Sequence, residues 1–213
     1  MICPLQRIDG GQSSPDELGS GFGGMVVAAG KPMLALILIS INVGSGEPPE
    51  NYRTDSARFL MYAITDLMTQ DHRSCDELLV AVEHAVANAD WPRARSEFAH
   101  FHRRMLHHFG VEEAVLFPAF EQSTGIYRGP TQVMRAEHAQ LRQLLAATES
   151  ALAGEDADDY SGHAETLLIM MQQHNVKEEN ILYPMCDQHL ADQFDTLLPS
   201  LQHEIAAHED PPT

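Results

Sequence analysis

Apolar residues recur every three or four positions from residue 55 onward, which is the spacing of an amphipathic helix. The pattern predicts four helices, over about 56–88, 92–121, 130–153 and 159–187. No segment of 55–213 alternates between apolar and polar residues in the manner of a strand. The apolar positions that define the first helix are Phe59, Tyr62, Ile64, Leu67, Met68, Cys75, Leu78, Leu79, Val82 and Val86.

Short connections separate the predicted helices. Asp90 is expected to cap the second helix, and Gly154 is expected to follow the third. Pro118 and Pro184 lie near the ends of the second and fourth helices and are expected to kink or stop them. These elements predict an all-α fold, an antiparallel up-down-up-down four-helix bundle over residues 55–190. Residues 191–213 have helical spacing and are expected to form an extra C-terminal segment that packs across the bundle or frays.

Residues 1–54 have a different composition from the rest of the chain. Residues 1–24 are rich in Gly, Ser, Asp and Pro, and residues 33–43 form an apolar run that is shorter than the about 20 residues a membrane span needs. Three interpretations remain open. Translation starts later, the segment is a poorly ordered extension, or it is an export signal or anchor. The candidate later starts are Met25, Met33 and Met61.

The chain repeats itself at an offset of 66 residues. The segment HFGVEEAVLFP at 108–118 matches HNVKEENILYP at 174–184, and the same offset carries His72 to His138. The first two helices and the last two are therefore interpreted as two copies of one helical hairpin. Each copy has one His on its first helix and a His-x-x-x-Glu motif on its second.

The repeated residues have the chemistry of a metal site. His and Glu four positions apart lie on one face of a helix, and two antiparallel hairpins would bring four imidazoles and two carboxylates into one core. A single motif of this kind is usually a solvated pair, but two copies in fixed register favour the metal interpretation. Bridging carboxylates favour a pair of iron or manganese ions, with zinc as an alternative. The predicted metal ligands are His72, His108, Glu112, His138, His174 and Glu178.

Composition narrows the classes of partner. The formal charge is −18, from 31 acidic and 13 basic residues, which argues against binding to nucleic acid or to an anionic membrane surface. The chain has three cysteines, and they form no C-x-x-C pair. This pattern is typical of a reducing compartment, so we expect a cytoplasmic protein.

The motifs together resemble those of the haemerythrin-like HHE cation-binding domain family, over about residues 61–190. The resemblance implies a bundle around two non-haem iron ions, expected to share an oxo or hydroxo bridge. Oxygen carriers of the family have a fifth His where this chain has Arg142, and an Asp where it has Glu178. The set of four His and two Glu resembles more closely the branch of the family that repairs iron centres. Proteins of that branch often carry a cysteine-bearing N-terminal domain, whereas residues 1–54 of this chain hold only Cys3. The matching residues are Asp71-His72, His108-x-x-x-Glu112-Glu113 with Leu116-Phe117-Pro118, Glu137-His138, and His174-x-x-x-Glu178-Glu179 with Leu182-Tyr183-Pro184.

The function expected from this resemblance is to bind, sense or detoxify O₂, peroxide or NO, with repair of iron centres under oxidative or nitrosative stress as one form of it. The alternative is a regulatory or interaction module in which the metal site is mainly structural. Whether the protein is an enzyme is left open. The expected partner is a small diatomic ligand or peroxide, and a homodimer is compatible with the sequence.

Several further residues have two interpretations. Glu113 and Glu179 are expected to support the ligands from behind, because one residue turns a helix by about 100°. Cys75 and Tyr183 are expected in the core, where Tyr183 could also hydrogen-bond the metal cavity, and Cys186 is expected to be exposed. Arg142 could point inward toward the metals or lie exposed at a helix edge. The remaining histidines are not expected to be ligands, and they are His84, His100, His102, His107, His163, His189, His203 and His208.

Overall fold

The computed structural model of the chain describes residues 63–207. The predictions for residues 1–54, for the first turns of the first helix and for His208 lie outside the described residues. The regular elements are α3 (Ala63–Ala87), α4 (Trp91–Val111), η2 (Glu112–Leu116), α5 (Phe117–Thr124), α6 (Pro130–Ala153), α7 (Ala157–Lys177), η3 (Glu178–Leu182), α8 (Tyr183–His189), η4 (Ala191–Gln193) and α9 (Phe194–Ala206).

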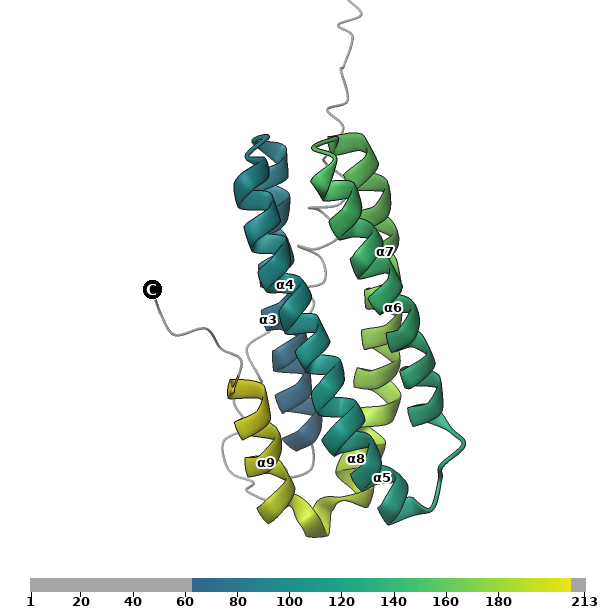
Figure 1. Cartoon of the computed structure of the whole chain (residues 1–213). Helices are drawn as coiled ribbons and strands as arrows, with labels where there is room; N and C mark the ends of the chain where they lie inside the picture. Colours follow the sequence, from purple (N-terminus) through teal and green to yellow (C-terminus); the bar gives the residue numbers. More distant parts are fainter. Residues whose placement is uncertain (1–62, 208–213) are drawn as a thin grey trace, which may run out of the picture.

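These elements form the predicted all-α bundle of two hairpins. The first hairpin is α3 followed by the continuous run α4–η2–α5, and the second is α6 followed by α7–η3–α8. The four long helices lie side by side, and α9 packs back against α3 and α4 at one end of the bundle (Figure 1). The expected C-terminal segment is therefore helical and packed. Within the described residues, no helix is long and apolar enough to cross a membrane.

Helix ends follow from local hydrogen bonding. Asp90 caps α4 as predicted, since its side chain accepts a hydrogen bond from the Arg93 N–H. Gly154 follows α6 but keeps a right-handed conformation with φ of −74°, and the left-handed residue is Glu155 with φ of 56°. The Asp187 carboxylate on α8 accepts hydrogen bonds from the backbone near the start of α3, which fixes the second hairpin to the first.

Each long second helix contains one wide turn just before its proline. In η2 the N–H of Phe117 donates to the carbonyl of Glu112, and in η3 the N–H of Tyr183 donates to the carbonyl of Glu178. This five-residue spacing is that of a π turn. Because a proline has no N–H and its ring clashes with an ordinary helical turn, the wide turn lets the helix continue. Of the two expectations for the prolines, a stop is therefore wrong, and the helices continue past them as the ranges 92–121 and 159–187 predicted.

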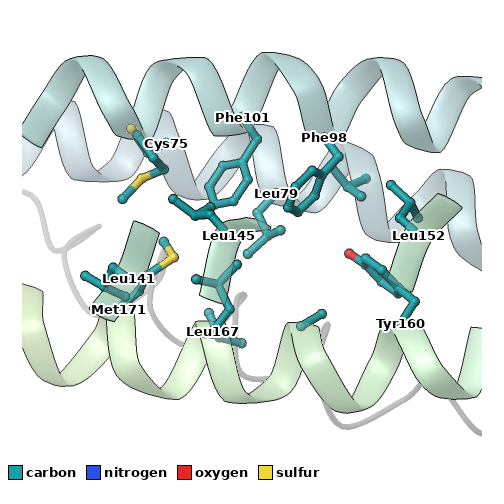
Figure 2. Close-up of a cluster of buried hydrophobic side chains, with 14 of the residues drawn as sticks. Cys75, Leu79, Phe98, Phe101, Leu141, Leu145, Leu152, Tyr160, Leu167 and Met171 are labelled. Carbon is teal, nitrogen blue, oxygen red and sulfur yellow. The ribbon is translucent and has the colours of Figure 1, made fainter. Parts of the chain in front are cut away.

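The core is divided into two apolar clusters. The first cluster lies toward the α3–α4 and α6–α7 connections and is called the loop-end cluster. It contains Leu79, Phe98, Leu145 and Leu167, and side chains from both hairpins meet in it (Figure 2). The α9-end cluster contains Met68, Phe117, Leu182 and Leu201. The predicted ligands lie at the boundary between the two clusters. On α3, for example, His72 comes between Met68 and Cys75.

The two described cysteines are both buried. Cys75 belongs to the loop-end cluster as predicted, with an exposed fraction of 1%. Cys186 belongs to the α9-end cluster with an exposed fraction of 0%, so the prediction that it is exposed is wrong. The reason is that α8 continues past Pro184 and packs against α3. Burial raises the pKa of both thiols.

Candidate metal centre

The structure brings all six predicted ligands together in the middle of the bundle. Every one of them has an exposed fraction of 3% or less. His72 on α3 faces His108 on α4, with their Nε2 atoms 3.0 Å apart. His138 on α6 faces His174 on α7, with their Nε2 atoms 3.1 Å apart. Each hairpin therefore contributes one pair of imidazoles.

The two glutamates connect the imidazole pairs. Glu112 Oε2 lies 3.4 Å from His108 Nε2 and 3.1 Å from His138 Nε2. Glu178 Oε2 lies 3.2 Å from His174 Nε2 and 3.4 Å from His72 Nε2. Each carboxylate thus reaches both imidazole pairs, which is the arrangement of a bridging ligand. Donor atoms of these residues lie within 4.8 Å of one another in two groups: Glu112 with His138, His174 and Glu178, and His72 with His108 and Glu178.

The rear nitrogen of every ligand imidazole is held by a carboxylate. His108 Nδ1 lies 2.8 Å from Asp71, and His174 Nδ1 lies 3.1 Å from Glu137. These two bonds lie within a hairpin, and the 66-residue offset relates Asp71 to Glu137. Because an ionised carboxylate only accepts hydrogen bonds, each Nδ1 is the donor, and each Nε2 of a neutral ring is left with its lone pair toward the centre.

The other two rear bonds cross between the hairpins. His72 Nδ1 lies 2.8 Å from Glu179 of the second hairpin, and His138 Nδ1 lies 2.7 Å from Glu113 of the first. Glu113 and Glu179 are related by the same offset. The prediction that they support the ligands from behind agrees with these contacts.

Cations stand behind three of these carboxylates. Buried Arg104 donates to Asp71 and, across 2.9 Å, to the carbonyl of Ile205 in α9. Lys177 donates to Glu137. Arg142 donates to both oxygens of Glu113 at 3.0 Å, and its guanidinium lies 5.3 Å from the centre of the Phe109 ring. Arg142 is half-buried and pairs with Glu113, which holds His138 from behind, so it fully matches neither of the two predicted placements.

Hydrogen bonding shifts the pKa values of the supporting groups. Burial raises the pKa of Asp71, but the bond to His108 and the charge of Arg104 outweigh it and lower that pKa below its ordinary value. Burial is likewise outweighed at Glu113 by Arg142 and His138, and at Glu137 by Lys177 and His174, so both pKa values are lowered. All three carboxyls are therefore ionised at neutral pH and oriented to accept from Nδ1.

The inner groups need positive charge between them. Two neutral imidazoles that face each other with lone pairs at 3.0 Å repel, and the buried atoms Glu112 Oε2 and Glu178 Oε1 have no hydrogen-bond partner. Two donors bound at right angles to one ion at about 2.1 Å stand about 3.0 Å apart. The donor set therefore fits metal ions, with His72 and His108 on one side and His138 and His174 on the other.

Without metal, protons would supply this charge. Burial lowers the pKa of His72, but hydrogen bonds to Glu178 and Glu179 outweigh it and raise that pKa to about 10. The same competition raises the pKa of His174 through Glu178. Burial raises the pKa of Glu178, whereas hydrogen bonds from His174 and His72 hold it well below its ordinary value. Glu178 therefore stays ionised, and its negative charge favours a proton or a metal ion beside His72 and His174.

Tyr183 lies in the core and also hydrogen-bonds the centre, in agreement with both expectations for it. Its hydroxyl donates to Glu112 Oε1 across 2.8 Å, and it also lies 3.2 Å from Glu178 Oε2 and 3.1 Å from His72 Nε2. In an ordinary α-helix a residue five positions after Glu178 would point about 140° away. The wide turn η3 brings it back to the same face. Burial and the charges of Glu112 and Glu178 raise its pKa well above the ordinary value.

The other described histidines lie outside the donor cluster. His84, His163, His189 and His203 are exposed, as predicted for surface residues. His102 contacts Glu149 across 3.1 Å, and His107 contacts the carbonyl of Glu204 in α9. Asp71, Glu137, Arg104 and Lys177 had no role assigned from the sequence, although the 66-residue offset links the first two.

The comparison with known families decides what kind of domain holds this centre. The model of the family described as Hemerythrin HHE cation binding domain matches residues 63–186. The chain belongs to this family. As an HHE cation-binding domain, it is a metal-binding helical protein, and the cluster of His and Glu residues is its candidate site. No curated protein and no solved structure shows significant similarity to the chain.

Proposed function

We propose that this HHE domain binds two non-haem iron ions and uses them to bind, sense or detoxify O₂, peroxide or NO. The observation that carries the proposal is that each glutamate reaches both imidazole pairs. A pair of bridging carboxylates with two imidazoles on each side is a donor set for two transition-metal ions, and this mixture of donors favours iron. Elemental analysis separates iron from manganese and zinc.

The chemistry that bound iron supplies is a change of oxidation state together with coordination positions that the protein leaves free. The six protein groups cannot fill six positions on each of two ions, even when both carboxylates bridge. His72 and His108 would hold one ion, His138 and His174 would hold the other, and Glu112 and Glu178 would connect them. The two apolar clusters exclude water from the site on either side.

The residues behind the ligands favour a reactive centre over a simple oxygen carrier. Arg142 occupies the position where an oxygen carrier would have a fifth His, and its guanidinium is bound to Glu113. One protein ligand fewer leaves more room for an exogenous ligand. Repair of iron centres under oxidative or nitrosative stress is the specific role that we propose, with the reducing cytoplasm as its location.

The first experiment measures metal content and the response to small ligands. Purified protein is expected to hold two irons per chain and to change its visible spectrum with NO, peroxide or O₂. Replacing both bridges, Glu112→Gln with Glu178→Gln, is expected to abolish two-metal binding. The matched control replaces two exposed glutamates, Glu149→Gln with Glu155→Gln. Retention of two metals by the bridge variant would contradict the ligand assignment.

A regulatory or interaction module with a mainly structural metal site is the second candidate. The observation in its favour is that the six ligands come from both hairpins, so bound ions would hold the bundle together. This alternative predicts a large loss of thermal stability on chelation and a spectrum that does not respond to NO, peroxide or O₂. A spectral response at two irons per chain would rule it out.

A further inference from the structure

One hydroxyl group breaks the symmetry of the duplicated centre. The 66-residue offset matches every inner ligand with a residue of the same type, and it matches Tyr183 with Phe117. The two rings occupy equivalent places. The Tyr183 ring lies against His72 with centroids 5.7 Å apart, and the Phe117 ring stacks on His138 with centroids 5.8 Å apart.

Core packing alone does not explain the hydroxyl. Both rings have an exposed fraction of 0%, and Phe117 shows that a phenyl group fills such a place. A hydroxyl buried without partners is costly, so its position is set by the groups that it contacts. Those groups are Glu112 Oε1 at 2.8 Å, His72 Nε2 at 3.1 Å and Glu178 Oε2 at 3.2 Å. All three belong to the predicted ligands.

The equivalent place on the other side of the centre holds no hydroxyl. The offset relates the pair Tyr183 and Glu112 to the pair Phe117 and Glu178. The hydroxyl contacts one oxygen of each glutamate, Glu112 Oε1 and Glu178 Oε2, and the other oxygen of each, Glu112 Oε2 and Glu178 Oε1, is buried without a hydrogen-bond partner. The imidazole that distinguishes the two sides is therefore His72, which lies beside the hydroxyl, whereas a phenyl ring stacks on the equivalent His138.

We propose that Tyr183 is a positioning residue that makes the two ion positions of this centre unequal. Position 1 is the one held by His72 and His108, and position 2 is the one held by His138 and His174. The hydroxyl lies on the side of position 1, beside His72, and its one hydrogen orients the Glu112 bridge. The proposal rests on the two-ion centre proposed above.

Inequality of this kind has measurable consequences that do not depend on turnover. Groups that orient a metal ligand commonly change metal affinity by about 10- to 100-fold. The two binding steps for a divalent ion are therefore expected to be separated by about tenfold beyond the statistical factor for two identical sites. The two irons of the loaded protein are expected to give two distinct Mössbauer doublets of equal area.

Two matched variants test the proposal from opposite directions. Tyr183→Phe removes the hydroxyl from position 1, and Phe117→Tyr adds one beside position 2, where Glu178 Oε1 can accept its hydrogen bond. Both variants equalise the positions, so both are expected to bring the two binding steps and the two doublets closer together. Helical circular dichroism and thermal melting establish that each variant is folded.

The outcomes separate this proposal from the one that it rests on. Failure of the unmodified protein to bind two ions overturns the two-ion centre itself. Two ions with doublets and binding steps that neither variant changes overturn the role of Tyr183 alone. If Tyr183→Phe does not fold, Phe117→Tyr decides: convergence supports the proposal, and an unchanged difference overturns it. A merely structural role for the tyrosine ring predicts no convergence on adding the second hydroxyl.

Discussion

The buried pair of Asp71 and Arg104 allows the stability of the fold to be separated from the strength of the metal site. The side chains are 1% and 7% exposed, and the same carboxylate accepts from His108 Nδ1. Arg104→Met would leave the Asp71 charge without its cation, and Asp71→Leu would leave the Arg104 charge without its anion. Breaking a buried ion pair from one side destabilises a protein by about 3–5 kcal/mol. For a domain of this size that corresponds to a fall in melting temperature of about 6–20 °C.

The double replacement separates the two roles. Exchanging a buried ion pair for apolar side chains of similar size often leaves stability unchanged. The variant Asp71→Leu with Arg104→Met is therefore expected to have a free energy of unfolding within about 2 kcal/mol of that of the unmodified protein. Metal affinity is expected not to recover with it. His108 still lacks its Nδ1 acceptor in the double variant, and losing such a partner weakens metal binding by about 10- to 100-fold.

The assays are thermal unfolding of chelator-treated protein and a competition titration of the metal with a chelating dye. Arg104→Met alone should lose stability while keeping most of its metal affinity, because Asp71 still holds His108. The reasoning is refuted if the double variant is no more stable than the single ones. It is also refuted if metal affinity returns together with stability.

Three other perturbations have expected outcomes. Arg142→Met should change the free energy of unfolding by about 1 kcal/mol or less and, like Arg104→Met, keep most of its metal affinity, because Glu113 still accepts from His138; Arg93→Met, in an exposed pair, should leave metal binding unchanged. The metal-free protein should lose stability as pH rises from His72's ordinary pKa of 6.5 to its folded value of about 10, because a raised pKa favours the folded state only while the proton is bound. Melting temperatures of the loaded protein should lack this slope, since an ion replaces the proton. Ending the chain after Leu190 should lower the melting temperature and increase binding of a hydrophobic dye, because α9 covers the α9-end cluster and accepts from Arg104.

The buried cluster of His and Glu side chains was predictable because two periodicities agree. A four-residue spacing puts His108 and Glu112 on one face, and the 66-residue offset reproduces that face and adds His72 and His138. The bundle followed from the helical period and the short loops. Helix ends that depend on a local hydrogen bond, such as the Asp90 cap, were also within reach of the sequence.

The parts that were missed depend on departures from the regular helix and on distant contacts. The contact of Tyr183 with the cavity was foreseen only beside core packing, because the period of 3.6 residues turns this residue away from Glu178 and the wide turn of η3 brings its hydroxyl back. Cys186 was assigned to the surface because Pro184 was expected to end its helix. The tie from Arg104 to α9 joins residues 101 positions apart, and no local pattern signals it.

The crossed hydrogen bonds bear on how such a centre could arise and assemble. Glu113 of the first hairpin holds His138 of the second, and Glu179 of the second holds His72 of the first. Cut within residues 125–129, the chain would yield complementary fragments, each with an imidazole whose partner is on the other fragment. An ancestral single hairpin could have built the centre only by pairing with a copy of itself. The present chain then has the form of that dimer fused into one polypeptide, which guarantees that the two halves are always present in equal number.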